Sequence, residues 1–338
     1  MAESDNMAGV DVSVVIASHR CDSRLHESLD SVAAQGAHPT WECVIVANGS
    51  FQPDAKLRAR LQEDPRFRLI HSPEPGLTRA LRRGCAEAHG SLIARLDSGD
   101  AMLVDRLRYQ AEVFARHPGV VLATSAVQVC GPLWEPIWVD GTGAAADRPL
   151  RTDNSPPEQG ISLDIPHHAS VMFRRDAYEK AGGYRTEFYF GQDWDLWFRL
   201  AREGEMYLDS RTLTAVRLQP DGISSRHRRE QVRIARISLA CYVARCCGQS
   251  EAELLQCAAR IGPQPVRPQR FRLPWDGRLA EGYYFIAEGL RRNGDRRCHR
   301  YFLGAIRQGF WKPRIWIRTL QSLGLFGRYS SAARKSLA

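Results

Sequence analysis

The stretch VSVVIASHRCDSRLHESLDSVAAQG, residues 12–36, decides the fold because it joins an apolar run to an amphipathic one. Residues 12–18 are apolar and rich in β-branched side chains, which is typical of a strand buried on both faces. Leu25, Leu29 and Val32 then recur at helical spacing. The stretch therefore predicts a buried strand followed by a helix that packs on the sheet.

The same alternation continues to residue 97. Further strands are predicted at 42–48, 66–72 and 91–97, with helices at 53–64 and 76–90 between them. Strands that alternate with helices predict a doubly wound, mainly parallel α/β sheet with helices on both faces. Ligands of such sheets bind outside the carboxyl ends of the strands.

Polar residues stand at three of these carboxyl ends. His19 follows the first strand, Asn48 ends the second, and Asp97 and Asp100 follow the fourth. Two carboxylates on one turn can hold Mg²⁺, which completes its coordination with water and phosphate oxygens. The alternative is an ordinary surface turn, because Asp and Gly are common turn residues. The position at a strand end favours the binding site.

A third carboxylate is predicted at a helix start. The segment GQDWDLWFRLAREG, residues 191–204, predicts a helix with Asp193 in its first turn. We expect the helix macrodipole to lower the pKa of this carboxyl. A carboxylate held rigidly beside Trp194, Trp197 and Phe198 suits a general base for a hydroxyl group. The alternative is an Asp that caps the helix.

Two further groups could bind a ligand. His167 and His168 open a predicted strand at 167–175, where they either line a site or pack in the interior. Residues 219–230 combine a glycine turn with several arginines, among them Arg226. Arginine forks match phosphate oxygens, so this segment either holds a diphosphate or is a solvated basic linker.

The pattern loosens beyond residue 130. Residues 131–160 are rich in Gly and Pro and predict a long loop over the ligand site, and a Pro-rich break lies at 262–269. Residues 226–338, predicted to be mostly helical, hold 23 Lys and Arg against 7 Asp and Glu, a net charge of +16. The other 24 basic and 31 acidic residues give residues 1–225 a net charge of −7. We therefore expect a catalytic domain at 1–225 and a helical region at 226–338 with a separate task.

Residues 309–329 mix aromatic, aliphatic and basic side chains. In a helix that starts near residue 313, Trp316, Leu320 and Leu323 share one face. Such a helix suits an interface with anionic lipid. The alternatives are a packing helix of a C-terminal subdomain and a nucleic-acid contact. We expect no nucleic-acid partner, because no such binding motif accompanies the arginines.

Cysteines and termini narrow the class of protein. The nine cysteines form no CxxC pair, and their spacing predicts neither a zinc knuckle nor a disulfide framework. We expect small buried thiols in a reducing compartment. The first residues lack the basic and apolar regions of a signal peptide, and no apolar run of about 18 residues predicts a membrane span.

Taken together, five stretches resemble the family 2 glycosyltransferases, nucleotide-sugar enzymes of GT-A fold. The stretches are VSVVIASHRCDSRLHESLDSVAAQ, WECVIVANGS, GLTRALRRGCAEAHGSLIARLDSGDAMLVDRL, HHASVMFRRDAYEKAGGYRTEFYFGQDWDLWFRLA and VRLQPDGISS. In order and spacing they are similar to the family's opening strand and helix, second strand, metal-motif block, acceptor segment and closing segment. The resemblance covers about residues 10–228.

The resemblance implies roles for several positions. Asp97 and Asp100 stand in the motif that holds a divalent cation, Mg²⁺ or Mn²⁺, on the diphosphate of the donor. Asp193 stands at the position of the family's catalytic base for an inverting transfer. Asn48 stands where the family has a carboxylate that reads the nucleobase. The donor is expected to contact Ala17, His19, Asn48, Arg79, Asp97, Ser98 and Arg226, and the acceptor to contact His167, His168, Gln192 and Trp194.

The sequence also departs from the family's pattern. Gly99 replaces the middle carboxylate of the metal motif, and Gln192 replaces the Glu before the base. Asn48 replaces an Asp, and Gln219 stands where the family often has a His that approaches the metal. These departures imply a metal site that is either weaker or more dependent on the substrate's own phosphates.

The sequence thus predicts a metal-dependent inverting glycosyltransferase of bacterial surface polysaccharide biosynthesis. Its donor would be a nucleotide sugar, and its acceptor a glycan carried on a lipid. We expect it in the cytoplasm, with peripheral contact at the inner face of the membrane. One alternative is a non-catalytic nucleotide-binding or regulatory module, which Gly99, Gln192 and Gln219 favour. The other is a nucleotidyltransferase, which is disfavoured because residues 17–25 contain no glycine for a phosphate loop.

Overall fold

The computed structural model of the chain describes residues 9–141, 147–150, 165–222, 227–262 and 275–324. The described residues divide between two compact units. The first contains Met1–Gln128, Val139–Val216 and Arg229–Pro265, and the second contains Val129–Trp138, Arg217–Arg228 and Val266–Ala338. This division by compactness places part of the basic region with the sheet. The functional boundary expected between residues 225 and 226 stays a prediction.

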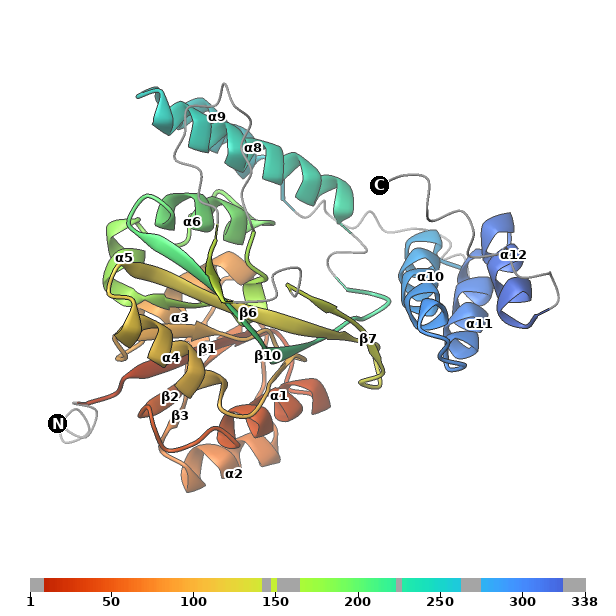
Figure 1. Cartoon of the computed structure of the whole chain (residues 1–338), viewed down its shortest axis with the longest axis horizontal. Coiled ribbons are helices and arrows are strands. Elements are labelled where there is room, and N and C mark those ends of the chain that lie inside the picture. The colour runs from red at the N-terminus through yellow and green to blue at the C-terminus, as the bar shows by residue number, and fades with distance from the viewer. Residues whose placement is uncertain (1–8, 142–146, 151–164, 223–226, 263–274, 325–338) are drawn as a thin grey trace. The chain divides into compact units, whose positions relative to one another are not determined.

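The first unit is built on a sheet whose leading strands are parallel (Figure 1). They are β1 (Val12–Ser18), β2 (Trp41–Asn48), β3 (Phe67–Ser72) and β4 (Leu92–Arg95), in the order β3-β2-β1-β4. Next in the sheet come β9 (Met172–Arg174), β6 (Val120–Cys130), β10 (Glu205–Arg217) and β5 (Ala101–Met102). β9 runs antiparallel to both β4 and β6. The predicted doubly wound, mainly parallel sheet is confirmed.

Successive residues of β1 face opposite sides of the sheet and enter two separate cores. Val14 and Ile16 belong to one cluster of buried side chains, and Val15 and Ala17 belong to the other. All four are buried. An apolar run without polar alternation is therefore what a strand covered on both faces requires.

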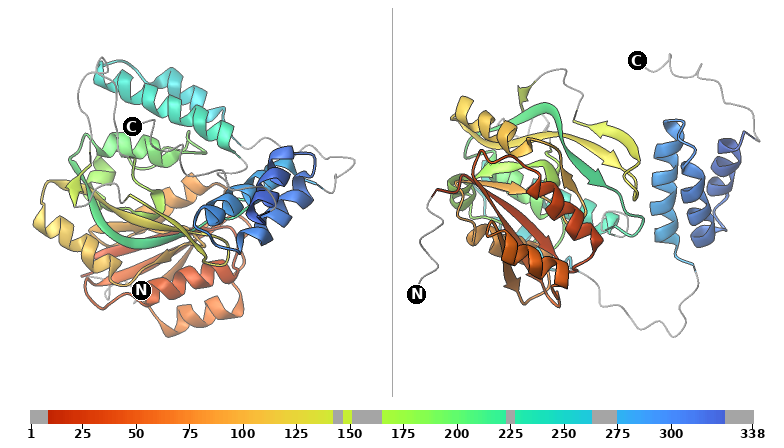
Figure 2. Two further views of the ribbon diagram at one scale, coloured as in Figure 1. Left: turned by 45° about the vertical axis from the view of Figure 1, so that its right-hand side comes forward. Right: turned by 90° about the horizontal axis from the view of Figure 1, so that it is seen from below.

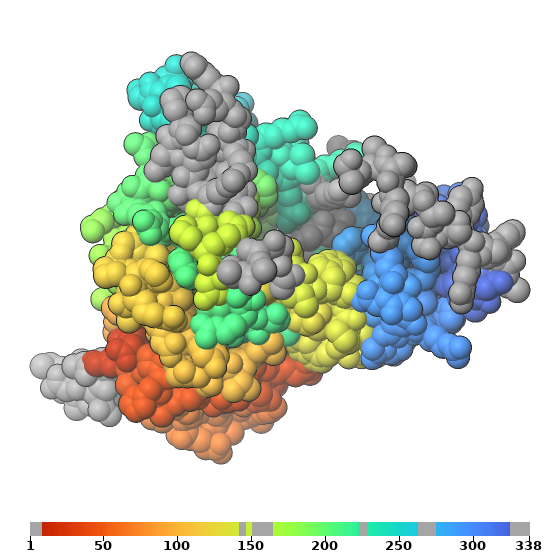
Figure 3. Space-filling view, in the orientation of Figure 1, coloured from red at the N-terminus to blue at the C-terminus, as the bar shows by residue number. Residues whose placement is uncertain are grey.

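Helices cover both faces. They are α1 (Ser23–Ala33), α2 (Ala55–Glu63), α3 (Leu77–Ala86), α4 (Arg106–Arg116), α5 (Arg175–Lys180) and α6 (Gln192–Leu200). Two more helices of this unit, α8 (Arg228–Cys246) and α9 (Ala252–Ala259), pack against Phe188 and Phe190 in a cluster of their own. Leu25 of α1, Leu57 of α2 and Leu107 of α4 share the core of Val14, whereas Leu81 of α3 and Trp197 of α6 share the core of Val15. One side of α4 is buried against the sheet, and its opposite side is visible at the surface of the unit in the space-filling view (Figure 3).

The region beyond residue 130 differs from the prediction. The loop expected at 131–160 contains two strands within its described part, β7 (Pro136–Asp140) and β8 (Arg148–Pro149), which pair with β6 and β10. The strand expected at 167–175 begins with a 3₁₀ turn, η2 (His168–Ser170), and only then forms β9. Most of the Pro-rich break lies outside the described residues.

The second unit contains three packed helices, α10 (Gly277–Arg292), α11 (Cys298–Gly309) and α12 (Pro313–Ser322), which lie side by side in Figure 2. Its interior includes Ile286, Leu290 and Phe302. The hydroxyl of Tyr301 donates to Glu135 Oε1 at 2.7 Å and ties α11 to the segment before β7. Among the described residues no helix is both long and apolar enough to cross a membrane.

One buried arginine joins α4 to the centre of the sheet. The Arg106 side chain is fully buried. Its Nη atoms donate to the carbonyl oxygens of Ala169 (2.8 Å), Arg95 (3.0 Å) and Val171 (3.1 Å). Its Nε donates to Gln110 Oε1 at 2.9 Å. One guanidinium therefore connects backbone carbonyls at the end of β4 with those just before β9.

We predict that Arg106→Met destabilises the protein by about 3 kcal/mol or more, because each buried polar group left unpaired costs about 1–3 kcal/mol. The matched control is Arg108→Met on the same helix. Arg108 is 42% exposed and pairs with Asp105 and Glu112 at the surface, and exposed pairs are worth about 0–1 kcal/mol. Urea denaturation of both variants checks this; equal effects would contradict the role assigned to Arg106.

Candidate active site

The turn after β4 is held in place by a serine of α1. The amide of Gly99 donates to Ser28 Oγ at 2.8 Å, and that hydroxyl donates to the carbonyl oxygen of Asp100 at 2.7 Å. The amide of Asp100 donates to the carbonyl oxygen of Asp97 at 3.0 Å. Gly99 has a φ of +105°, a region that side-chain-bearing residues rarely adopt. The glycine of this turn therefore satisfies a backbone requirement as well as replacing a carboxylate.

A buried arginine sits behind this turn. Arg95 is the last residue of β4, and its side chain is 1% exposed. Its Nη1 donates to the carbonyl oxygens of Val15 and Leu96, and its Nη2 pairs with Asp97 Oδ1. Burial is the largest single influence on the pKa of Asp97 and acts to raise it, but the charge of Arg95, the histidine pair and the hydrogen bond from Arg95 together lower the pKa below its ordinary value. Asp97 is therefore held ionised.

The histidine pair meets Asp97 from the other side. His168 Nδ1 lies 3.8 Å from Asp97 Oδ2, and its Nε2 lies 3.0 Å from the hydroxyl of Tyr184. Burial lowers the pKa of His168 to about 3 and also lowers the pKa of His167. His168 is therefore neutral at physiological pH. His167 Nδ1 accepts from the amide of Ala169 at 3.4 Å, which starts the η2 turn.

Asp193 lies in the first turn of α6, as predicted, but the predicted direction of its pKa shift is wrong. Burial raises the pKa of Asp193 to about 6, and the negative charge of Asp97 adds to this rise. The backbone amides of Trp194 and Asp193 and the charge of Arg95 act in the opposite direction without overcoming it. Loss of hydration therefore outweighs the helix start, and Asp193 titrates near neutral pH.

These contacts bring several predicted residues together at the carboxyl end of β4. Asp97 and Asp100 share one turn, His168 lies beside Asp97, and Asp193 is within electrostatic reach of Asp97. Gln192 is buried, whereas Trp194 is half-buried and its ring meets Phe198 edge-on at 6.4 Å. The structure thus assembles an ionised carboxylate, a carboxyl of near-neutral pKa and neutral imidazoles.

The predicted donor residues lie at the ends of β1, β2 and β4. Ala17 is buried in β1, and Ser98 Oγ accepts from the hydroxyl of Ser18, the last residue of β1, at 3.2 Å. Asn48 ends β2, and its Oδ1 accepts from the amide of Gly76 at 3.0 Å. The side-chain oxygen of Asn48 therefore positions the segment before α3.

The remaining predicted residues are either exposed, outside the described residues or in the second unit. His19 is exposed just beyond β1. Arg79 is also exposed and pairs with Glu74 at 3.2 Å. Arg226 lies outside the described residues, and Gln219 belongs to the second unit. Within the described part of the first unit, no hydrogen bond or ion pair links His19 or Arg79 to Asp97 or Asp193.

Sequence reasoning missed three residues of this centre. Arg95 supports Asp97, Arg106 supports the backbone behind it, and Tyr184 contacts His168. Arg95 carried a usable signal, because it is a charged residue within the apolar run SLIARLD and buried charges require partners. Nothing in the sequence pattern alone indicated Tyr184.

The donor set of the turn fits a hard divalent cation. Asp97 and Asp100 supply carboxylate oxygens from one turn, and such oxygens are the ligands that Mg²⁺ prefers. The lowered pKa of Asp97 keeps that carboxylate available as an anion. Gly99 supplies no side-chain ligand, so most of the coordination would come from water and substrate.

The raised pKa of Asp193 predicts a pH-dependent cost in stability. Its pKa is about 6 in the folded protein against an ordinary value of 3.8. The folded state therefore binds this proton more tightly, and stability falls as pH rises from about 4 to about 6. We expect Asp193→Asn to match the wild type in melting temperature near pH 4 and to exceed it increasingly up to about pH 6.5.

Asp195→Asn on the same helix is the matched contrast. Asp195 is fully buried and pairs with Arg199 at 2.6 Å, so its loss leaves a buried arginine without its carboxylate. This variant should melt below the wild type at neutral pH. Differential scanning fluorimetry between pH 4 and pH 8 measures both variants. A melting temperature of Asp193→Asn that does not diverge from the wild type above pH 4 would refute the assigned shift.

Comparisons with known proteins agree with this geometry. The family model described as glycosyl transferase family 2 matches residues 13–182, about half of the chain. The chain is 29% identical to the amylovoran biosynthesis glycosyltransferase AmsE of Erwinia amylovora over 49% of its own length and 60% of that protein. It is 27% identical to the O-antigen biosynthesis glycosyltransferase WbnJ of Escherichia coli over 57% of its length and 72% of that protein.

Solved structures are similar in fold. The crystal structure of S. aureus TarS 1-349 gives a TM-score of 0.55 at 11% identity, covering 92% of this chain and 88% of that one. The same protein in complex with UDP gives a TM-score of 0.53 at 13% identity. The sheet described above has the GT-A fold, and the chain belongs to glycosyltransferase family 2.

Proposed function

We propose that the protein is an inverting glycosyltransferase of bacterial polysaccharide biosynthesis, in which Asp193 is the catalytic base. The observation that carries this proposal is a carboxyl of pKa about 6, placed within electrostatic reach of Asp97 at the carboxyl end of β4. A general base works best when its pKa lies near the operating pH. The relatives named for amylovoran and O-antigen biosynthesis support the substrate class.

The reaction follows from a single displacement. Asp193 accepts the proton of an acceptor hydroxyl as its oxygen forms a bond to the anomeric carbon of the donor sugar. The bond from that carbon to the diphosphate oxygen breaks on the opposite face, and a nucleoside diphosphate leaves. Because His168 is neutral, it can take part in hydrogen bonds to the acceptor without adding charge.

Asp97 and Asp100 would hold Mg²⁺ or Mn²⁺, which when bound stabilises the charge on the leaving diphosphate. Ala17, Asn48 and Ser98 lie at the neighbouring strand ends, where a nucleotide binds in sheets of this kind. UDP-sugars are reasonable first donors to test, because UDP is bound in a TarS structure of the same fold.

We predict that Asp193→Asn lowers kcat/KM about 10²- to 10⁴-fold, the contribution typical of general base catalysis. In the wild type, activity should fall below about pH 6 as Asp193 becomes protonated. A thermal-shift panel of UDP-, GDP- and dTDP-sugars, with and without Mn²⁺, first identifies the donor. Hydrolysis of that donor and transfer from it are then measured. The anomeric configuration of the product, read by NMR, establishes inversion.

The control is Asp176→Asn, which removes a carboxylate that is 67% exposed on α5. It should leave the rate unchanged. A folded Asp193→Asn enzyme with full activity would refute the assignment of the base. Donor binding without turnover in the wild type would instead favour the non-catalytic module. Asp100→Asn should remove the part of the donor's thermal shift that depends on Mn²⁺.

We also propose that the second unit contacts an anionic membrane that carries the lipid-linked acceptor. Trp275, Phe310 and Trp311 form an aromatic cluster with ring centroids 5.3–6.2 Å apart. Trp316 Nε1 donates to the carbonyl oxygen of Phe310 at 2.8 Å, and Ile317 follows it on α12. All five of these large apolar side chains are exposed.

The charge of this unit fits the same surface. Residues 275–324 hold ten Lys and Arg and four Asp and Glu, a net charge of +6. α12 nevertheless also packs on the unit, because Ile315 and Thr319 are buried and Leu320 is half-buried. The predicted apolar face is thus only partly available, through Trp316 and Leu323. Aromatic side chains with nearby basic residues are typical of membrane interfaces.

We predict that the protein co-sediments with vesicles containing phosphatidylglycerol, less with phosphatidylcholine alone, and less in high salt. Trp316→Ser should weaken binding by about tenfold or more, because burying a large apolar side chain contributes about 1.5–3 kcal/mol. The control is Trp138→Ser, which removes a 37%-exposed Trp whose ring packs on Phe285 instead. Equal binding to both lipid mixtures would argue against this contact.

A further inference from the structure

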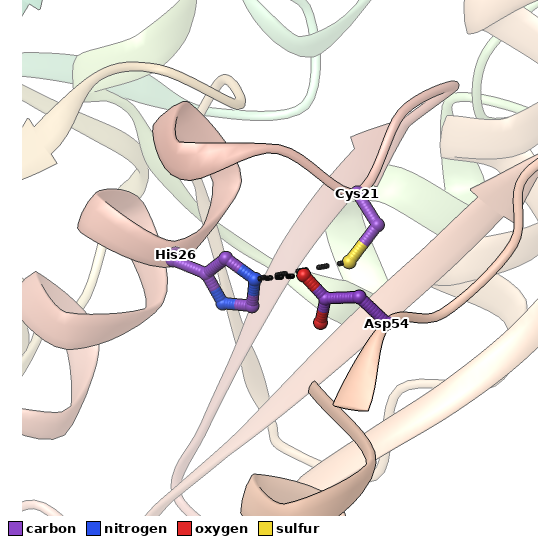
Figure 4. Close-up of side chains that lie close together, drawn as sticks. All are labelled: Cys21, His26 and Asp54. Carbon is purple, nitrogen blue, oxygen red and sulfur yellow. Dashed lines mark hydrogen bonds and ion pairs between the residues drawn. The ribbon is translucent and has the colours of Figure 1, made fainter. Parts of the chain in front are cut away.

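Three side chains that the proposed reaction does not use meet beside the carboxyl ends of β1 and β2 (Figure 4). Cys21 follows β1, His26 lies in the first turn of α1, and Asp54 caps the start of α2. His26 Nε2 lies 2.8 Å from Asp54 Oδ2 and 3.9 Å from Cys21 Sγ. The three ligand atoms all lie within 4.8 Å of one another, so they converge on one point.

This arrangement does not suit a nucleophilic cysteine. A catalytic His contacts the nucleophile through one ring nitrogen and its orienting carboxylate through the other. Here the thiol and the carboxylate both approach Nε2, and Nδ1 has no hydrogen-bond partner within the described structure. Burial also raises the pKa of the Cys21 thiol, whereas nucleophilic cysteines have lowered values.

The three ligand types instead match a borderline-soft metal ion. Thiolate, imidazole and carboxylate are the ligands of Zn²⁺, whereas Mg²⁺ prefers oxygen alone. Bond lengths of about 2.0–2.3 Å in a tetrahedral site place two ligand atoms about 3.3–3.7 Å apart. The observed separations from His26 Nε2, 2.8 and 3.9 Å, lie on either side of that range.

We propose that Cys21, His26 and Asp54 form a Zn²⁺ site, with a fourth position open to water and separate from the cation at Asp97 and Asp100. Three protein ligands with one open position are a common zinc arrangement. The site would join the loop after β1 to the start of α2. It rests on these contacts alone and not on the proposed glycosyl transfer.

The surroundings allow an ion to enter and bind. The Asp54 side chain is 44% exposed, whereas the His26 side chain is 8% exposed. Asp54 Oδ1 accepts from the amide of Leu57 at 2.8 Å, which fixes the carboxylate and directs Oδ2 toward His26. Binding would release the proton of the Cys21 thiol to water, so affinity should rise with pH.

The test uses the full chain carrying Cys246→Ser, Cys247→Ser and Cys257→Ser, because these three exposed thiols could bind metal themselves. Co²⁺ is the spectroscopic probe, and Zn²⁺ affinity is measured by competition with a chromophoric chelator. We expect one thiolate-bound ion per chain, with a thiolate-to-cobalt charge-transfer band that excess Zn²⁺ removes and Mg²⁺ does not. Cys21→Ser should abolish that band.

Asp54→Asn and Asp22→Asn are the matched pair of variants. Both aspartates cap a helix, α2 and α1 respectively, and Asn caps a helix about as well as Asp. Asp54→Asn should weaken Zn²⁺ binding by more than the roughly 10- to 100-fold that loss of an outer-shell partner brings. Asp22→Asn should leave the affinity unchanged.

Two results would overturn the proposal. One is the absence of a charge-transfer band in the folded parent protein. The other is equal Zn²⁺ affinity in the parent and in Asp54→Asn, which would identify the three side chains as a hydrogen-bonded group. If Cys21→Ser does not fold, as judged by circular dichroism, the parent spectrum and the Asp54→Asn affinity still decide. No donor or acceptor is present, so the outcome does not depend on transferase activity.

Discussion

The candidate site depends on the ion pair between Arg95 and Asp97. A guanidinium that is removed from water requires partners, and here the carbonyl oxygens of Val15 and Leu96 and the carboxylate of Asp97 supply them for its two Nη atoms. Its buried Nε has no hydrogen-bond partner among the described residues, so the Nη contacts carry the compensation. Losing the carboxylate would leave a buried charge uncompensated, which typically costs about 3–5 kcal/mol. The side chain that lowers the pKa of Asp97 is therefore also part of the interior, and the charge state of the site is fixed by the fold.

For Asp193, unlike Asp97, the fold disfavours the ionised form of the carboxyl. Its pKa of about 6 means that the ionised form is disfavoured by its surroundings, mainly through lost hydration. That cost is imposed on the folded protein at neutral pH and makes the carboxyl a better proton acceptor at the same time. Arg95 limits the cost, because its positive charge opposes the rise. The same buried arginine thus favours ionisation of both carboxylates, strongly for Asp97 and weakly for Asp193.

The sequence was informative where local pattern decides structure. The first four strands and the helices between them followed from apolar runs and helical spacing, and Asp97, Asp100 and Asp193 from residue type and position. It failed where tertiary burial decides. A helix start favours an anion by about 0.3–1 kcal/mol, and no pattern around Asp193 revealed that lost hydration exceeds this. β7 was missed because Pro and Gly surround it, and Tyr184 because its partner His168 is distant in sequence.

Gly99 connects the departures from the family pattern to the charge of the site. Asp97, Asp100 and Asp193 bring three carboxylates near two buried guanidinium groups, since Asp100 acts on Arg106 and Arg95 acts on Asp97 and Asp193. A fourth carboxylate at position 99 would add negative charge that only a cation could balance. An Asp or Glu at this position would also have to adopt the backbone φ of +105° that Gly99 has, a value that favours glycine. The glycine therefore lets the turn form with its charges nearly balanced, and a cation would be required by the diphosphate rather than by the fold.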